Sequence, residues 1–543
     1  MNLKAIEFKN KALMPYIVAL SRLALSVILL ILANTLAVPG WLSVVLMAVA
    51  ILISAFDIIY DVISAIKRKD YFNNACYLTF VTLIVFCIGC YKEAVLFVIF
   101  YQLLKLALEY AVKRTQNSAT DLIPEDNADD VELLKAIISQ PEAGKNPAIA
   151  KLRPYFEQFA RAALLVGVLF AVVMPLISDM TLVMSVRRGA MLISAAIPAS
   201  ALASLPLCSI YGISYSAAYG ILVRDAEILE KTANLKTVAF DKTDVFSEGL
   251  PKLATVISPK LDNDSFLKTA AYIAINSEQR IAAPIVRAYG GNIRTELIKD
   301  FREFPGTGME ITLNGVKMYL GTKDLLDARG VMLDPEDLRK GYVLYMVIGN
   351  QYAGSLTFKE NINPYAEAVI GDFAADGNVG TVLITEDGRE VSEKLARSLK
   401  VDSLYCECDT RKKLNAVQEL KDECADYEML MYVSAEEIDF HTAADIDAKV
   451  GDTADNADLL MSNIGIFGLP VAYMSAKRTK QITRQNTLLV ILIKLILVVL
   501  ALTGSATLWF VVLLDFAAGI GGVLNVSRIP AAPLEKQIKE KLE

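Results

Sequence analysis

The chain has 543 residues, a formal net charge of −7 and a composition that is 54% hydrophobic. This length predicts several domains, and the acidic balance argues against nucleic acid as a partner. Because 21% of the residues are charged, the apolar residues must be concentrated in particular segments of the chain. The seven cysteines form no regular framework, which is typical of a protein in a reducing compartment.

Apolar runs that approach the roughly 20 residues of a membrane helix occur eight times. Basic residues cluster before the first run and after the second, fourth and last runs. The positive-inside rule therefore places both termini in the cytoplasm and predicts a multi-pass protein of the cytoplasmic membrane. The expected membrane helices are 14–36, 41–66, 76–91, 93–112, 156–178, 187–216, 485–503 and 506–527.

The loop between the sixth and seventh of these helices is a soluble insert of about 260 residues, large enough for two domains. Buried strands are expected at 237–240, 379–385 and 428–433, with helices at 390–399 and 411–423. Strands that alternate with helices predict a parallel α/β sheet, whose sites lie at the carboxyl ends of the strands.

Asp241 stands at the carboxyl end of the first expected strand and is followed by Lys242 and Thr243. A carboxylate in this position can attack a phosphoryl group and form an aspartyl-phosphate. A loop aspartate that caps the next turn would have the same local sequence. The tripeptide alone therefore leaves both interpretations open.

The segments on either side of Asp241-Lys242-Thr243 resemble those of a known family. Ser194-Ala-Ala-Ile-Pro-Ala-Ser leads through Tyr219-Gly-Ile-Leu-Val to Thr237-Val-Ala-Phe-Asp-Lys-Thr, and Phe304-Pro-Gly-Thr-Gly-Met follows. This order resembles the heavy-metal P-type ATPases over almost the whole chain, and the last two helices look most like the zinc, cadmium and lead branch. The resemblance implies eight transmembrane helices plus a cytoplasmic α/β, haloacid-dehalogenase-like phosphorylation domain with an inserted α+β nucleotide-type domain.

The resemblance also implies domain boundaries. Membrane helices one to four would occupy 1–112, a short acidic loop in place of the actuator domain 113–154, and helices five and six 155–222. The phosphorylation-type domain would be discontinuous, 223–250 and 358–480, with the nucleotide-binding-type domain at 251–357 between its parts. Helices seven and eight would occupy 481–530, followed by a charged tail at 531–543.

Individual roles follow from the matched motifs. Asp241 would be the phosphoacceptor beside Lys242, and Thr243 would support the phosphate and metal. The other residues implied for the phosphate site are Thr385, Asp387, Lys413 and Asp439; those for the nucleotide are Glu278, Gly306 and Gly308; those for the ion path are Pro198, Lys494 and Asp515. The implied cofactors are ATP and Mg²⁺, with Zn²⁺ as the transported or bound ion.

Departures from the family pattern cluster on function. Asp244 and Glu386 add negative charge where phosphate should bind, which disfavours a further anion. Ala435 stands where the family has its magnesium-binding aspartate, so a hard oxygen ligand is lost unless the adjacent Glu436 substitutes for it. Gln279-Arg280 replaces the His-Pro of the nucleotide domain, and Ile197 and Ala199 replace the two cysteines around Pro198. The loop 113–154 contains no Thr-Gly-Glu, the motif whose glutamate activates the hydrolytic water in the family.

A carboxylate near mid-membrane costs roughly 2.5–3.5 kcal/mol, so Asp515 must have a partner. Lys494 is the expected one, and the pair is either a structural salt bridge or part of an ion path.

Two functions follow, and the sequence does not decide whether the protein is an enzyme. In the first, which the clustered losses favour, the chain is a pseudo-ATPase with a regulatory or scaffold role in metal-ion homeostasis and a protein partner in the lipid membrane. In the second, which the retained Asp241, Lys413 and Asp515 favour, it is an active ATP-driven transporter of a divalent cation such as Zn²⁺.

Overall fold

The computed structural model describes the chain from residue 3 to residue 529, with gaps. It divides into two compact units, one formed by Met1–Ala233 with Met474–Glu543 and the other by Asn234–Tyr473. The positions outside the description are 1–2, 36–38, 70–73, 121–146, 196–200, 244, 248–250, 278, 280, 305–306, 334–337, 339–341, 360, 378, 436–441, 452–456, 462–464 and 530–543.

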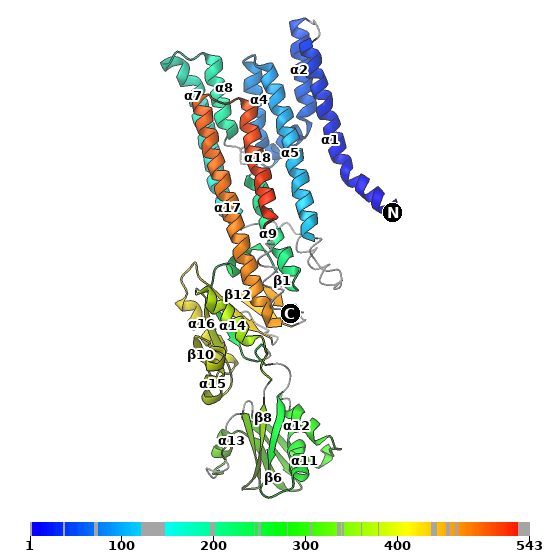
Figure 1. Ribbon diagram of the computed structural model, residues 1–543, viewed down its shortest axis with the longest axis vertical. Coiled ribbons are helices and arrows are strands. Elements are labelled where there is room, and N and C mark those ends of the chain that lie inside the picture. The colour runs from blue at the N-terminus through cyan, green and yellow to red at the C-terminus, as the bar shows by residue number, and fades with distance from the viewer. Residues whose placement is uncertain are drawn as a thin grey trace. The chain divides into compact units, whose positions relative to one another are not determined.

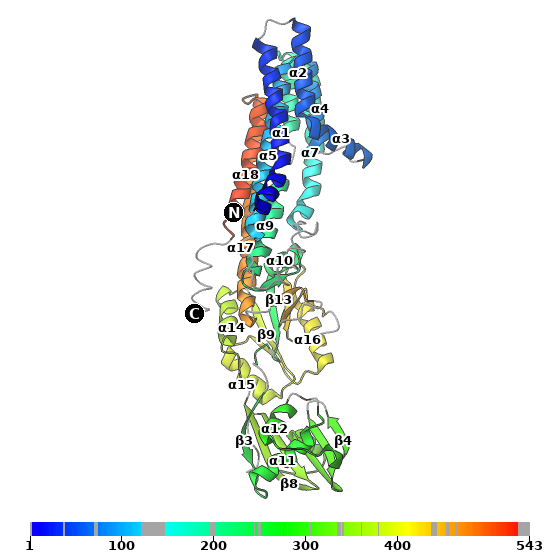
Figure 2. The same cartoon turned by 90° about the vertical axis from the view of Figure 1, so that its right-hand side faces the viewer.

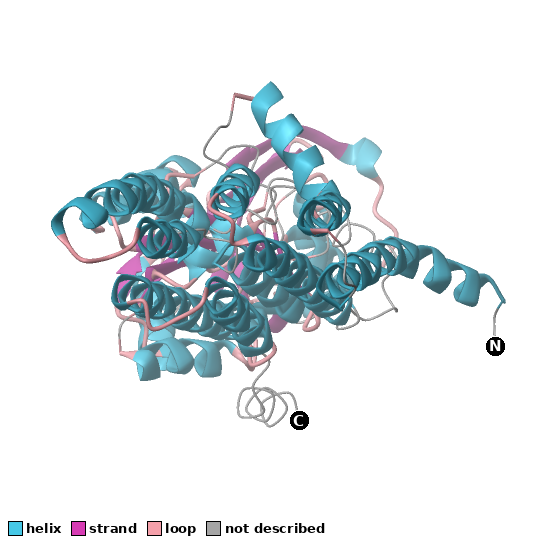
Figure 3. Cartoon of the chain, turned by 90° about the horizontal axis from the view of Figure 1, so that it is seen from above, coloured by secondary structure: helices cyan, strands magenta, loops and turns pink. Residues whose placement is uncertain are grey.

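The first unit is helical, and its helices lie side by side along their lengths (Figures 1 and 2). Seen from above, they form a bundle (Figure 3). Its described elements are α1 (Leu3–Thr35), α2 (Gly40–Ser54), α3 (Phe56–Lys67), α4 (Asn74–Cys87), α5 (Tyr91–Thr120), α7 (Pro147–Ile177), α8 (Leu182–Ala195), α9 (Ala201–Ala217), strand β1 (Ile221–Val223), α10 (Ala226–Thr232), α17 (Gly468–Thr503), which begins just before this unit, and α18 (Leu508–Val526).

Each expected membrane run falls on one or two of these helices, but not all are long enough to span alone. Within the described residues, five helices are long and apolar enough to cross a membrane, or six if the bent pair α2 and α3 is one span. That pair bends by 65° after Ser54, while α4, α8 and α9 have 14, 14 and 17 residues. Within the described residues, helix length alone thus supports five or six of the eight expected spans, and residues 196–200, inside the expected span 187–216, lie outside the description.

The bundle is held by apolar packing and by close helix contacts. Val81, Phe97, Leu207, Leu497 and Val511 belong to one buried cluster that joins α4, α5, α9, α17 and α18. Helices α7 and α8 approach closely at two glycines, because a Cβ on Gly189 would lie 2.4 Å from the carbonyl oxygen of Gly167. Small residues at such contacts are what membrane helices use to pack backbone against backbone.

The second unit contains a parallel sheet with helices on both faces. Its strands run in the order β13-β12-β11-β2-β9-β10. Helices α14 and α16 flank the strands on opposite sides (Figure 2). The elements are β2 (Leu235–Asp241), α14 (Ala366–Asp376), β9 (Gly380–Ile384), α15 (Arg389–Leu399), β10 (Ser403–Tyr405), α16 (Thr410–Glu423), β11 (Met429–Ser434), β12 (Ile446–Val450), β13 (Leu459–Met461) and the 3-10 turn η2 (Gly465–Phe467).

The three strands predicted from sequence are central in this sheet and close to their expected bounds. Successive side chains of β2 point to opposite faces of the sheet. Ala239 packs in the cluster beneath α16, while Phe240 contacts Phe246 and Phe373 on the other face, so both faces of the strand are covered.

Between β2 and β9 the chain forms an antiparallel sheet with the strand order β3-β8-β7-β6-β5-β4. Helices α11 and α12 cover one face and α13 the other, since Leu344 and Met346 pack with the first pair while Val343, Tyr345 and Val347 pack with Leu326 of α13. The elements are β3 (Lys252–Ile257), α11 (Asn263–Ala274), α12 (Ala282–Tyr289), the 3-10 turn η1 (Thr295–Leu297), β4 (Ile298–Phe304), β5 (Gly308–Leu313), β6 (Val316–Gly321), α13 (Lys323–Ala328), β7 (Tyr342–Ile348) and β8 (Gln351–Lys359).

Candidate functional site

Three parallel strands end together at one edge of the sheet and bring the polar residues of the site to a single place. Asp241, the last residue of β2, is paired in register with Ile384, the last residue of β9. On the other side of β2, Val433 near the end of β11 is in register with Phe240. The prediction that Asp241 ends a buried strand is therefore confirmed by the backbone.

The carboxylate of Asp241 is buried, with 5% of its side chain exposed, and it accepts three hydrogen bonds. Its Oδ2 accepts from Lys413 Nζ at 2.8 Å and from the Tyr432 hydroxyl at 3.0 Å. Its Oδ1 accepts from the backbone N–H of Thr243 at 3.2 Å. Both oxygens are thus engaged with groups of the protein itself.

Lys413 reaches the site from the first turn of α16, whose N-terminus is capped by the Asp409 side chain. Its ammonium group lies between two carboxylates, at 2.8 Å from Asp241 and 3.1 Å from Glu386. Burial alone would lower the pKa of Lys413, but these two negative charges outweigh it and raise the pKa above its ordinary value. The lysine is therefore fully charged at neutral pH and neutralises Asp241.

The residues after β9 form the second half of the site. Lys242 is buried and makes a close ion pair with Asp387. The Thr385 hydroxyl accepts a hydrogen bond from the Asp387 backbone N–H at 3.1 Å, which fixes the turn. The structure thus brings together Asp241, Lys242, Thr243, Thr385, Asp387 and Lys413, six of the seven residues that the resemblance implies for the phosphate site.

The seventh, Asp439, lies outside the described residues, as do Asp244 and Glu436. Described β11 ends at Ser434, and the next residue is Ala435, whose methyl group has no oxygen to offer a metal. No group of three or more Asp, Glu, Cys or His residues that could hold a metal occurs among the described residues. Within that part of the chain the residues do not fit a Mg²⁺ ion, which prefers several oxygen ligands in octahedral geometry.

Of the three residues implied for nucleotide binding, the structure describes one. Glu278 and Gly306 lie outside the described residues. Gly308 has a φ of +146°, and a Cβ there would lie 2.4 Å from the Cα of Gly321 and from the carbonyl oxygen of Leu320. This position therefore requires glycine for the packing of β5 against β6, independently of any nucleotide. Gln279, which stands where the family has histidine, donates to the Phe304 carbonyl oxygen at 3.1 Å.

Along the expected ion path, Lys494 of α17 and Asp515 of α18 form an ion pair of 2.5 Å. Both side chains are buried, with 5% and 7% exposed. The pairing predicted from the cost of a lone carboxylate in a membrane is therefore confirmed. Pro198 lies outside the described residues.

Tyr432 is the site residue that sequence reasoning missed. It lies in the apolar strand β11, and its backbone is in register with Ala239, two residues before Asp241. The signal in the sequence was a tyrosine hydroxyl inside the apolar run Met-Leu-Met-Tyr-Val, before Ser434 ends the strand. A buried tyrosine hydroxyl usually has a hydrogen-bond partner, so this residue pointed to a polar neighbour without naming it.

Comparisons with known proteins agree with this geometry. A family model of haloacid dehalogenase-like hydrolases matches residues 235–433, the range that contains Asp241 and Tyr432. The cadmium, zinc and cobalt-transporting ATPase of Bacillus subtilis (strain 168) is 26% identical over 394 residues, covering 70% of this chain and 56% of that protein. The zinc-transporting ATPase of Synechocystis sp. is 27% identical over 351 residues, covering 63% and 48%.

Among solved structures, a zinc-transporting PIB-type ATPase in its E2.Pi state shares the fold, with a TM-score of 0.62 at 18% identity over 96% of this chain and 99% of that one. The chain spans about half the length of the curated relatives that it matches. Taken with the Asp-Lys-Thr strand end and the buried Lys494–Asp515 pair, these comparisons support the heavy-metal P-type ATPase family as the family of this chain.

Proposed function

We propose that this protein is a pseudo-ATPase of the membrane, which keeps the scaffold of a heavy-metal pump and acts in metal-ion homeostasis without turning over ATP. The observation that carries the proposal is the state of Asp241. Its Oδ2 is hydrogen-bonded to both Lys413 and Tyr432 and its Oδ1 accepts from the Thr243 N–H, so groups of the protein already engage both oxygens of the expected nucleophile.

The surroundings of Asp241 support the same conclusion. Glu386 places a second carboxylate on Lys413, so the positive charge that would neutralise an incoming phosphate is shared by two anions. Ala435 stands where an aspartate would bind Mg²⁺, and phosphoryl transfer depends mainly on positioning and on neutralising phosphate charge. Lys242 is likewise paired with Asp387. Each positive group of the described site is thus already matched with a carboxylate of the protein.

In this proposal the phosphorylation-type domain, 223–250 with 358–480, and the nucleotide-type domain, 251–357, are retained as a folded cytoplasmic module. The membrane helices hold it at the cytoplasmic membrane with both termini in the cytoplasm. The role is regulatory or structural and involves a protein partner in the same membrane.

A second candidate is an active ATP-driven transporter of a divalent cation such as Zn²⁺. Two observations favour it. Six of the residues implied for phosphoryl transfer meet at one sheet edge, and a buried Lys494–Asp515 pair lies in the helices where the family moves its ion. In this alternative Asp241 is phosphorylated, with Thr243 and Lys413 beside the phosphate.

Labelling with ATP that carries a radioactive γ-phosphate separates the two. The purified chain is incubated with the nucleotide, Mg²⁺ and Zn²⁺, quenched in acid, and compared with the Asp241→Asn variant and with the Bacillus subtilis relative as a positive control. The pseudo-ATPase proposal predicts no acid-stable label above that of Asp241→Asn. Label on the native chain that is absent from Asp241→Asn would overturn the proposal and favour the transporter alternative, which Zn²⁺ uptake by vesicles then tests.

A further inference from the structure

A cavity of about 370 Å³ lies in the helical unit, between the start of α7, α9, α10 and the middle of α17. Its walls are largely apolar, and three of its lining residues are basic: Lys151, Lys480 and Arg484. Only one acidic residue, Glu230, is among the described lining residues, and it is paired with Lys151 at 2.9 Å. The cavity therefore combines an apolar interior with a net positive lining.

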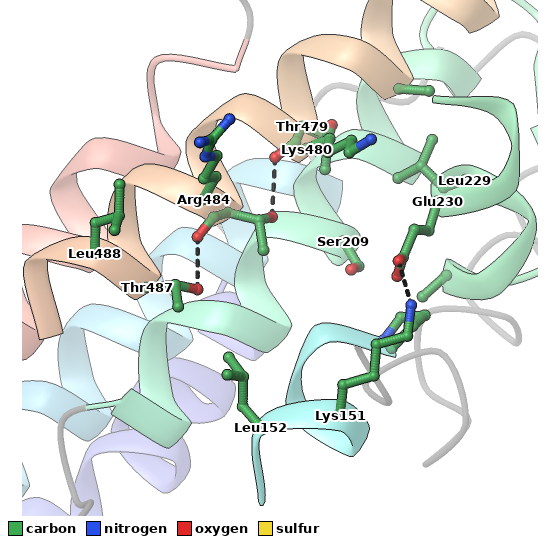
Figure 4. A pocket seen from close by; sticks show the side chains of 14 residues that line it. Lys151, Leu152, Ser209, Leu229, Glu230, Thr479, Lys480, Arg484, Thr487 and Leu488 are labelled. Atoms are coloured by element: carbon green, nitrogen blue, oxygen red, sulfur yellow. Dashed lines mark hydrogen bonds and ion pairs between the residues drawn. The ribbon is translucent and has the colours of Figure 1, made fainter. Parts of the chain in front are cut away.

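Figure 4 shows how these groups are arranged. Lys480 and Arg484 extend from α17 at one side of the cavity, the Lys151–Glu230 pair lies at the opposite side, and Ser209 lies between them. Two of the three basic lining residues thus extend from the α17 wall of the cavity.

The threonines of the wall add methyl groups rather than free donors. The hydroxyls of Thr479, Thr483 and Thr487 each donate to the carbonyl oxygen four residues earlier in α17, at 2.9 Å. A hydroxyl that donates within its own helix has no proton left for a ligand. On the α17 wall the donors for an anion are therefore Lys480 and Arg484, while the threonine methyl groups extend the apolar wall.

The cavity lies at one end of an exposed apolar face of α17. Leu488 lines the cavity and is 56% exposed, and the exposed apolar residues Leu492, Leu495, Val499 and Leu502 follow it. Steps of three or four residues place all of them on one helical face. Arg484 precedes Leu488 by four residues and lies on the same face. This face is therefore basic at the cavity and apolar beyond it.

These distances match a phospholipid. With a rise of 1.5 Å per residue, the stretch from Leu488 to Val499 is about 16 Å long. That is about half of the roughly 30 Å hydrocarbon core of a bilayer, the thickness of one leaflet. Basic pockets between membrane helices on the cytoplasmic side are typical sites for anionic headgroups.

We propose that this cavity binds an anionic phospholipid of the cytoplasmic leaflet. Its phosphate is held by Lys480 and Arg484, and its acyl chain runs from the cavity along Leu488, Leu492 and Leu495. The proposal does not depend on whether Asp241 is ever phosphorylated, because none of its residues belongs to that site.

Native mass spectrometry of the purified full chain tests the proposal with two lipids of identical acyl chains, phosphatidylglycerol and phosphatidylcholine. The native protein should retain phosphatidylglycerol preferentially. The double substitution Lys480→Ala/Arg484→Ala should weaken this binding about 30-fold, because each basic residue near an anionic surface changes the affinity about fivefold. Lys477→Ala is the matched control: this lysine is exposed on the same helix and does not line the cavity, so its loss should leave the binding unchanged.

Ser209→Leu tests the cavity separately, because it fills space without changing the charge. This substitution should reduce lipid retention. The thermal unfolding midpoint of the variant is measured in parallel to check that it is folded. Equal retention of both lipids, or an equal loss in Lys477→Ala, would overturn the proposal. Competition by inorganic phosphate as effective as by phosphatidylglycerol would also overturn it and identify a site for a free anion.

Discussion

Asp241 is fixed by partners that come from three different elements, and this is the central fact at the scale of single residues. Lys413 belongs to α16, Tyr432 to β11, and Thr243 to the turn that follows β2, two residues after Asp241. A buried carboxylate is tolerated only when it is paired and hydrogen-bonded. The bonds therefore stabilise the strand ends at the same time as they occupy the carboxylate.

The contribution of the tyrosine can be measured by removing its hydroxyl. Tyr432→Phe keeps the ring in the core and removes one hydrogen bond to Asp241, while Lys413 still neutralises the charge. A hydrogen bond to a charged group contributes about 1.5 kcal/mol or more. Hydrogen exchange of β2 and β11 should therefore become at least about tenfold faster, as followed by mass spectrometry of peptides from the full chain.

The control for this experiment is Tyr427→Phe, two residues before β11, where the side chain is 75% exposed. That substitution should leave exchange in both strands unchanged. Equal exchange in native protein and Tyr432→Phe would show that the tyrosine does not hold Asp241.

Residue types and spacing predicted part of this site. Asp241 was placed by the strand predicted at 237–240, three of whose four residues are apolar and which ends at a carboxylate, and Lys413 by a matched family position. Tyr432 was missed because the strand register decides which side chain reaches Asp241. Tyr432 and Asp241 lie 191 residues apart in sequence, so no local pattern contains this register.

At the scale of elements, the parallel sheet was more predictable than the antiparallel one. Buried parallel strands are short apolar runs, and those at 237–240, 379–385 and 428–433 are visible in the sequence. The antiparallel strands between Lys252 and Lys359 have one or both faces partly covered and mix polar with apolar residues, so only an inserted domain was expected there.

The contact between β5 and β6 gives a prediction at this scale. Gly308→Ala would place a methyl group 2.4 Å from the Cα of Gly321, at a φ of +146° that L-residues rarely adopt. Such overpacking costs roughly 1–3 kcal/mol. Exchange of amides in β5 and β6 should therefore become faster in the absence of any nucleotide.

Gly371→Ala in α14 is the matched substitution, because nothing lies within 4 Å of a Cβ at that position. There alanine should slow exchange in the helix slightly, since glycine in a helix interior is less stable than alanine by about 0.5–1 kcal/mol. If Gly308→Ala left β5 and β6 unchanged without nucleotide, then a role in ligand binding rather than packing would account for that glycine.

At the scale of the whole molecule, one ion pair between the membrane helices can distinguish a scaffold from a pump. The Lys494–Asp515 pair is buried, and its two charges come from neighbouring helices α17 and α18. Removing one partner of such a pair lowers the free energy of unfolding by about 3–5 kcal/mol, whereas replacing both partners with apolar residues of similar volume is often neutral. A structural pair and an ion path therefore respond differently to paired substitutions.

We expect Lys494→Met and Asp515→Leu each to lower the thermal unfolding midpoint of the detergent-solubilised protein, and the double variant to recover most of the loss. In the pseudo-ATPase proposal, vesicles with the native chain take up no more Zn²⁺ with ATP than vesicles with Asp515→Ala, because the pair serves the fold alone. ATP-dependent uptake by the native chain that Asp515→Ala abolishes would assign the aspartate to transport. Recovery of stability by the double variant together with equal uptake would instead identify the pair as a bond between helices, inherited from a pump and kept for the scaffold.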